Sequence, residues 1–254
     1  MPKHPASIFI MDIQNSSAEG IGEELSAYLE KMVKWIKTWT TEEVIVKHRR
    51  GDEVILIANG YSAAYVIAHF ISVIWKLRDN PPYFGVSFGD INRELQEIDI
   101  ETWIHPMIKL AREANESLKK EGADRAQFRF HLNENRYEIQ VLINSLLVLR
   151  QKIMNEQTDI QRMVFSLYEI FRQQRKISGI LSKSPSTISS HFKKGSGEEL
   201  EMIFANLTAV TNSLQQKEFP DSHQALTELQ QSIRNHLQKN ISEWYENEEG
   251  KGNL

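Results

Sequence analysis

Two aspartates in the first quarter of the chain stand where carboxylates could bind a cation. Asp12 lies at the end of an apolar, β-branched run that predicts a buried strand over residues 7–13, and Asp52 lies in the turn of a predicted hairpin. Neighbouring strands would bring these carboxylates together. Mg²⁺ binds one or two carboxylates and completes its shell with water and substrate phosphate. The spacing therefore predicts a magnesium site at Asp12 and Asp52.

The hairpin turn adds further polar groups beside this site. Glu53 could supply a third oxygen, and Arg49 and Arg50 stand where they could meet the phosphate of a nucleotide. The alternative is an ordinary acidic turn, because Gly-Asp is a common turn dipeptide. Asp12 favours the metal, since an acid at the end of an apolar strand is costly unless it is exposed, hydrogen-bonded or metal-bound.

A second group of residues, from 171 to 195, has the pattern of two short helices joined by a turn. Ile177 and Leu181 would share the apolar face of the first helix. Ile188 and Phe192, four residues apart, would share that of the second. Packing of these two faces predicts a helix-turn-helix.

The second of these helices begins with a cap and presents a small, polar surface. Ser184 can accept a hydrogen bond from a first-turn amide, and Pro185 lacks the amide that would otherwise stay unpaired. Residues 171–195 carry six Lys or Arg and no Asp or Glu, in a chain of net charge −4. This pattern predicts contact with double-stranded DNA, the alternative being a solvated helical hairpin. The predicted DNA-binding residues are Arg175, Lys176, Lys183, Ser184, Ser186, Thr187, Ser189, Ser190, Lys193 and Lys194.

The segments that position these residues predict an α+β fold. Strand, helix, hairpin, helix and strand follow one another before residue 133, the order of a ferredoxin-like or nucleotidyl-cyclase-like α/β sandwich. A further helix and an edge strand complete that part, and every later segment has helical period. The predicted parts are an α/β domain at 1–132, an all-α helix-turn-helix domain at 133–195, C-terminal helices for dimerisation at 196–245, and a flexible tail at 246–254.

Composition restricts the location of the protein. Apolar residues make up 41% of the chain, but no apolar run reaches the roughly 18 residues that a membrane span needs. The chain has no cysteine, which excludes disulfides and thiolate metal sites. We therefore expect a cytoplasmic protein without a membrane segment.

The order of several short motifs resembles the SatD family, a little-characterised bacterial family. These are IFIMDIQNSS, VIVKHRRGDEVILI, YFGVSFGDI and KLAREANESLKKE, followed by QTDIQRMVFSLYEIFRQQRKISGILSKSPSTISSHFKKG. The resemblance covers roughly residues 7–195, and it implies a cyclase-like domain joined to a helix-turn-helix. Through that family the first domain is similar to class III nucleotidyl cyclases and, more distantly, to GGDEF diguanylate cyclases. The likeness implies that Asp12 and Asp52 are the metal-binding acids and that Arg112 contacts the nucleotide.

The chain departs from the cyclase pattern where substrate is recognised. His48 stands three residues before the hairpin glycine, where cyclases have Lys, and Ile108 stands four residues before Arg112, where they have Asn. The hairpin also lacks the second glycine and the Phe of the GGDEF signature. These departures favour a degenerate cyclase-like domain that binds a nucleotide or metal without turnover.

The favoured hypothesis is a cytoplasmic, DNA-binding transcriptional regulator whose first domain senses a nucleotide or Mg²⁺, or serves as a dimerisation scaffold. One alternative is a nucleotidyl cyclase-like enzyme with a regulatory helical domain, and another is a protein that binds only protein partners. A single helix-turn-helix reads a half-site, so we expect a homodimer. The candidate dimer contact is the apolar stripe Leu200, Ile203, Leu207, Val210 and Leu214, the alternative being that these residues are ordinary core.

Overall fold

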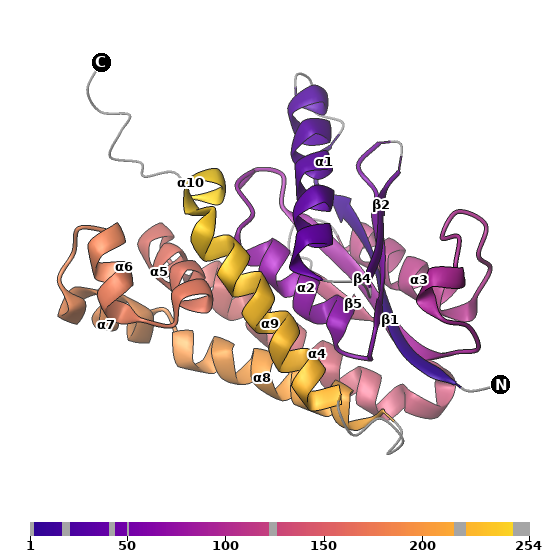
Figure 1. Cartoon of the computed structure of the whole chain (residues 1–254). Coiled ribbons are helices and arrows are strands. Elements are labelled where there is room, and N and C mark those ends of the chain that lie inside the picture. The colour runs from indigo at the N-terminus through magenta and orange to yellow at the C-terminus, as the bar shows by residue number, and fades with distance from the viewer. Residues whose placement is uncertain are drawn as a thin grey trace.

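The fold is mixed α+β with a five-stranded sheet (Figure 1). The strand order is β2-β3-β1-β4-β5, and neighbours are antiparallel except β4 and β5, which are parallel. The computed structural model describes residues 3–16, 21–40, 44–49, 51–121, 126–215 and 222–245. The strands are β1 His4–Ile13, β2 Val44–His48, β3 Val54–Asn59, β4 Pro82–Ile91 and β5 Phe128–Phe130.

Helices pack on both faces of the sheet. Along β1, Ile10 points to the face covered by α3 (Pro106–Lys120), and Met11 points to the face covered by α1 (Gly22–Trp39) and α2 (Ala63–Val73). Successive side chains of a strand leave opposite faces, so the apolar run of β1 serves two cores. This is why the strand reads as continuously apolar in the sequence.

Helix α2 is buried on all sides. Every residue from Ala63 to Ile71 is buried, as expected for a helix that is apolar around its whole circumference. One side packs on the sheet, and α9 (Ser222–Lys239) crosses the other side and also contacts α1. Helix α2 therefore joins the sheet to helices from the C-terminal half of the chain (Figure 1).

Helix α4 (Tyr137–Glu156) closes the open edge of β5 with side-chain amides. Asn144 accepts from the N–H of Phe130 at 2.8 Å and donates to the carbonyl of the same residue at 2.8 Å. Gln140 and Gln151 accept from two further backbone amides of this edge, at 2.7 and 3.0 Å. These bonds occupy backbone groups that an edge strand would otherwise expose.

The remaining helices follow the predicted order. The hydrophobic core on the sheet face covered by α1 and α2 extends into the helices that follow residue 133. It therefore crosses the predicted domain boundary between residues 132 and 133. No helix in the described part of the chain is both long and apolar enough to cross a membrane. The predicted tail, 246–254, lies outside the described residues. These helices are α5 Asp159–Phe171, α6 Gln174–Ile180, α7 Pro185–Lys194, α8 Gly197–Ser213, α9 and α10 Ile241–Trp244.

Three of the five residues of the apolar stripe predicted as the dimer contact on α8 belong to the core, whereas Val210 is exposed and Leu214 is half-buried. Leu200, Ile203 and Leu207 are buried against neighbouring helices. Helical periodicity shows that a face is apolar but does not distinguish a core from an interface. Large exposed apolar side chains are more numerous on α4, at Tyr137, Val141, Leu142, Val148 and Leu149, than on α8, which exposes Met202 and Val210.

Candidate functional sites

The predicted acids gather at one end of the sheet, on the face covered by α3. Asp12 is the second-last residue of β1, and Glu53 directly precedes β3, which pairs with β1. Helix α3 can lie close to the sheet because Gly85 of β4 has no side chain. A Cβ at this position would collide with the backbone carbonyl of Ala111 in α3. This close packing brings Arg112 of α3 to the acids.

Glu53 is the counter-ion of two arginines. It accepts from Nη1 of Arg49 at 3.0 Å and from Nη1 of Arg112 at 2.9 Å. A second bond from Arg112, at 3.4 Å, makes that contact forked. The hydrogen bonds from Arg112 to Glu53 raise the pKa of the guanidinium. Two residues predicted to bind nucleotide phosphate are therefore already held by a carboxylate.

Asp12 is mostly buried and forms no ion pair with another described residue. Burial raises its pKa from 3.8 to about 6, and the negative charges of Asp52 and Glu53 act in the same direction. Lys119 and Arg112 act against this shift. A partly buried carboxylate beside a second acid is a place where a divalent cation would relieve repulsion.

Within the described ranges, no group of three or more His, Cys, Asp or Glu is arranged to hold a metal ion. Both carboxylate oxygens of Glu53 are already paired with Arg49 and Arg112, so the remaining candidate ligands for a metal ion are Asp12 and Asp52. Two carboxylates still suit Mg²⁺, which keeps several waters in its shell. Arg50, predicted to meet a phosphate, lies outside the described residues.

Helices α6 and α7 form where the sequence pattern predicted them. Ser184 caps α7, its Oγ accepting from the N–H of Thr187 at 3.2 Å, and Pro185 is the first residue of the helix. The turn before it contains Ser182 at φ +50°, a left-handed conformation that glycine adopts more readily. The cap and the turn together set the direction in which α7 leaves α6.

Helix α5 completes a compact three-helix unit with α6 and α7. Ile188 and Phe192 of α7 are buried, as are the predicted apolar residues of α6. The ring of Phe192 packs on Tyr168 of α5, with centroids 4.3 Å apart. Gln157 donates from Nε2 to the carbonyl of Gly195 at 2.6 Å, which holds the end of α7.

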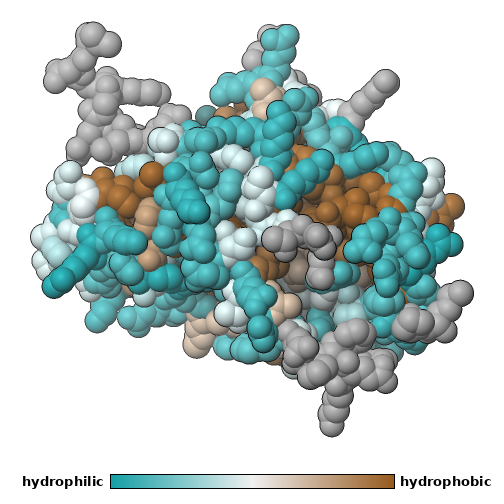
Figure 2. Space-filling view, in the orientation of Figure 1, coloured by the Kyte–Doolittle hydropathy of each residue, from teal (hydrophilic) through white to brown (hydrophobic). Residues whose placement is uncertain are grey.

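The outward surface of this unit is basic. Five cations of α6, α7 and the turn are exposed or half-buried, and in the described part of the chain none of them forms an ion pair: Arg175, Lys176, Lys183, Lys193 and Lys194. Arg172, the sixth cation of the stretch, pairs instead with Glu169, at 3.2 Å, and with Glu201. Figure 2 shows mainly hydrophilic and neutral side chains at the left of the molecule, where α6 and α7 lie, with a hydrophobic patch above them.

The small polar residues of α7 divide into two groups. Oγ of Ser184 lies 2.8 Å from the hydroxyls of Ser186 and Thr187, so Ser184 and Thr187 are engaged in the cap. Ser186 and Ser190 are exposed, and Ser189 is half-buried. Ser190, which is exposed and lies outside the cap, is therefore the best placed to contact a partner, and Ser186 is equally exposed but its hydroxyl contacts Ser184.

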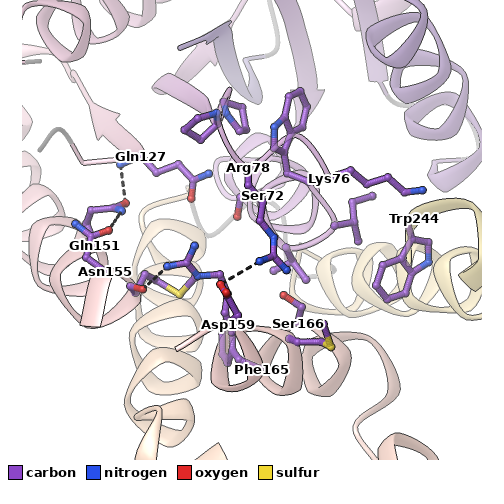
Figure 3. Close-up of a pocket in the computed structure, with 18 of the residues that line it drawn as sticks. Ser72, Lys76, Arg78, Gln127, Gln151, Asn155, Asp159, Phe165, Ser166 and Trp244 are labelled. Carbon is purple, nitrogen blue, oxygen red and sulfur yellow. Dashed lines mark hydrogen bonds and ion pairs between the residues drawn. The ribbon is translucent and has the colours of Figure 1, made fainter. Parts of the chain in front are cut away.

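A cavity of about 880 Å³, which the sequence did not predict, lies between α2, α4, α5 and α10 (Figure 3). Arg150 of α4 and Arg162 of α5 line it. The signal that could have revealed it is the spacing of Arg150 with Ile143 and Leu147. All three are buried, and a cation is unexpected on the buried face of a helix.

These features define a mixed α+β protein with an acid and arginine cluster at one end and a basic three-helix unit at the other (Figure 1). A scan against family models finds no match, and a search of curated proteins finds none. An EAL/GGDEF domain protein from M. capsulatus matches with 15% identity, over 50% of this chain and 85% of its own, at a TM-score of 0.36. The active GGEEF domain of a diguanylate cyclase from Vibrio cholerae matches with 17% identity, over 51% and 83%, at 0.35.

Proposed function

We propose that the protein is a transcriptional regulator that contacts double-stranded DNA through α7. The observation that carries the proposal is the surface of α6 and α7, where the five cations form no ion pair with other described residues. Side chains of this kind neutralise DNA phosphates and release counterions. The resemblance of the sequence to the SatD family, whose members carry a helix-turn-helix, supports the same function.

The arrangement of α7 suggests how it would meet the duplex. Ser186 and Ser190 lie on the exposed face, where short side chains allow a helix to approach base edges in the major groove. Lys193 and Lys194 lie in the last turn, where they reach the phosphate backbone. The chain as a whole has net charge −4, so the rest of the surface repels DNA and orients this face toward it.

The test is a binding titration of the purified protein with DNA from its own promoter region at several salt concentrations. The logarithm of the affinity is expected to fall linearly with the logarithm of salt, by about 0.9 for each phosphate neutralised. A scrambled duplex of equal length measures the non-specific part. Absence of salt-dependent binding to either duplex at low salt would remove the basis of the proposal.

We propose further that the DNA-bound form is a homodimer. One recognition helix reads one half-site, and specific affinity comes from two-fold symmetric pairs. The exposed apolar residues of α4 are more numerous than those of α8 and offer a second copy a contact surface, among them Leu142 and Leu149, which are 58% and 48% exposed. Light scattering of the free and DNA-bound protein tests this.

The second candidate function is Mg²⁺-dependent nucleotide binding at Asp12 and Asp52, as a sensor in the first domain. The observation that favours it is the raised pKa of Asp12 beside Asp52. Turnover is not part of the proposal, because His48 and Ile108 replace the cyclase Lys and Asn, and His48 contacts the carbonyl of Gly51 at 2.9 Å. Conversion of ATP or GTP to a cyclic product by the purified protein would favour the enzyme hypothesis instead.

A further inference from the structure

The cavity between α2, α4, α5 and α10 has a buried cation in its wall. Arg150 is 1% exposed, and its guanidinium carbon lies 4.9 Å from the centre of the Phe128 ring. It forms no ion pair within the described chain. Burial lowers the pKa of Arg150, while Tyr65 and Glu169 act in the opposite direction. A buried cation without a contacting carboxylate is unfavourable and therefore unusual.

The hydrogen bonds of Arg150 are long and incomplete. Nη1 donates to Oε1 of Gln127 at 3.4 Å and Nη2 to Oγ of Ser72 at 3.5 Å, beyond the usual 2.7–3.2 Å. Nε is buried and has no partner. Gln127 and Ser72 line the same cavity (Figure 3), so the donors of Arg150 are directed toward it. Several of its five N–H groups remain available to an acceptor there.

A second arginine in the cavity wall, Arg162, also has a buried N–H group without a hydrogen-bond acceptor. Arg162 of α5 donates from Nη2 to the carbonyl of Met154 at 2.9 Å, and its buried Nε has no partner. Among the other charged residues of the wall, Arg78 pairs with Asp159 at 3.0 Å. The lining contains four cations, Lys76 included, and a single acid, so it attracts an anion.

We propose that this cavity binds a phosphorylated small molecule of nucleotide size, with its phosphate held by Arg150 and Arg162. Two guanidinium groups offer the forked donors that suit phosphate oxygens. A volume of about 880 Å³ is that of a site for a small organic ligand rather than for an ion alone. The rest of the wall supplies amides and apolar groups for the ligand body, including Gln14, Gln151, Trp75 and Phe165.

This site is not the acid cluster of the first domain and does not depend on DNA binding. Its wall comes mainly from α4, α5 and the end of α2, and it reaches the ends of β1 and β4 at Gln14 and at Tyr83, which pairs with Asp12. Asp12 itself does not line the cavity, because its side chain leaves β1 on the face covered by α3, as that of Ile10 does. Helix α5 contributes to the cavity wall and also packs on α6 and α7. A bound ligand would therefore contact the helix that supports the basic surface.

Calorimetric titration with AMP, GMP and inorganic phosphate tests the proposal. EDTA is present, so that Mg²⁺ at Asp12 and Asp52 cannot contribute. One nucleoside monophosphate is expected to bind with 1:1 stoichiometry, more tightly than inorganic phosphate. Arg162→Ala, at a partly exposed position, should weaken binding about tenfold or more. Arg150→Lys keeps the charge and removes the fork, and it should weaken binding as well.

The double variant Lys193→Ala/Lys194→Ala is the matched control. It removes two cations from α7 and should leave nucleotide affinity unchanged, whether or not the variant still binds DNA. Circular dichroism and urea unfolding test whether each variant is folded. If Arg150→Lys does not fold, the affinity of Arg162→Ala alone tests the proposal. The proposal is overturned if no probe binds the wild type, if Arg162→Ala binds as tightly as the wild type, or if citrate binds more tightly than every phosphate probe.

Discussion

His69 of α2 donates a hydrogen bond from Nε2 to the carboxylate of Glu169 on α5, over 3.0 Å, and both side chains are fully buried. A carboxylate only accepts, so the hydrogen is on Nε2. Nδ1 has no partner, and a hydrogen there would be a buried donor without an acceptor. His69 is therefore neutral, and its ring stacks on Phe204 at 3.9 Å. The pair therefore connects α2, which packs on the sheet, to α5, on which α6 and α7 pack.

The first prediction is that the protein loses stability on mild acidification. Burial lowers the pKa of His69 from 6.5 to about 4. Between these values the unfolded chain binds a proton that the folded chain does not, so stability falls as pH falls through this window. Burial acts to raise the pKa of Glu169, but the hydrogen bond from His69 and the charge of Arg172 outweigh it and lower the pKa, so this contribution to stability is also lost as pH falls. Urea unfolding should give about 3 kcal/mol less stability at pH 4 than at pH 7 from His69 alone.

The variant His69→Gln isolates this contribution. Between pH 4 and 6.5, the free energy of unfolding of this variant should depend less on pH than that of the wild type. His236→Gln is the comparison, because burial lowers that pKa too, but the residue is only half-buried. An unchanged pH profile in His69→Gln would show that His69 is not the residue that senses acid. Glu169→Gln should lower the free energy of unfolding at neutral pH by about 1 to 3 kcal/mol, because it removes the buried carboxylate that accepts from His69 and Arg172, and Arg172 then keeps only Glu201.

The second prediction concerns Asp12. Without metal, Asp12→Asn should raise the free energy of unfolding at neutral pH by about 1 kcal/mol, because it removes a partly buried charge that Asp52 and Glu53 repel. With Mg²⁺, the wild type should gain thermal stability and the variant should not. Glu116→Gln makes the same charge change at an exposed position of α3 and should keep the Mg²⁺ response. Equal responses to Mg²⁺ in wild type and Asp12→Asn would exclude Asp12 as a ligand.

The third prediction concerns the basic surface. Lys193→Ala/Lys194→Ala should weaken binding to all DNA sequences alike and reduce the salt slope by about one unit for each phosphate that the variant no longer neutralises. The matched control is Lys34→Ala/Lys37→Ala on α1, which removes two exposed lysines far from α7 (Figure 1). Fluorescence anisotropy at several salt concentrations measures both slopes. Equal slopes in the two double variants would place the DNA-binding surface elsewhere.

The serines of α7 are expected to behave differently from the lysines. Ser186→Ala and Ser190→Ala should change the preference among DNA sequences by roughly 1 to 3 kcal/mol per affected base pair and leave the salt slope unchanged. Ile188→Asp is the structural control, since a charge among the buried residues of α7 should abolish binding by unfolding the unit. A selection of preferred sites from random duplexes, made with each serine variant, would reveal the shift.

The fourth prediction concerns assembly. Leu142→Asp/Leu149→Asp should convert a dimer into a folded monomer, because both side chains are largely exposed on α4 and a charge there would oppose a second apolar surface. Ala225→Asp, at an exposed position of α9, is the matched control and should leave the dimer intact. Light scattering at micromolar concentration distinguishes the two forms. A wild-type monomer that also binds DNA as a monomer would contradict the dimer.

The sequence by itself determined the local elements. The cap at Ser184, the proline that follows it and the apolar residues of α7 predicted that helix correctly. Apolar, β-branched runs predicted the first strands, and the Gly-Asp turn between two of them predicted the hairpin that contains Asp52. These features depend on residues within one or two turns of one another, and hydrogen bonding and burial at that range follow from spacing.

Tertiary structure decided which charges meet and which apolar faces are covered. Glu53 is held by Arg112, 59 positions away, and Arg172 is turned from the basic surface toward Glu169 and Glu201. Most of the apolar stripe of α8 is core, and only the packing of distant helices makes Arg150 part of a cavity wall. The energy of a charge or an apolar face depends on what packs against it, and that partner is set only when distant elements come together.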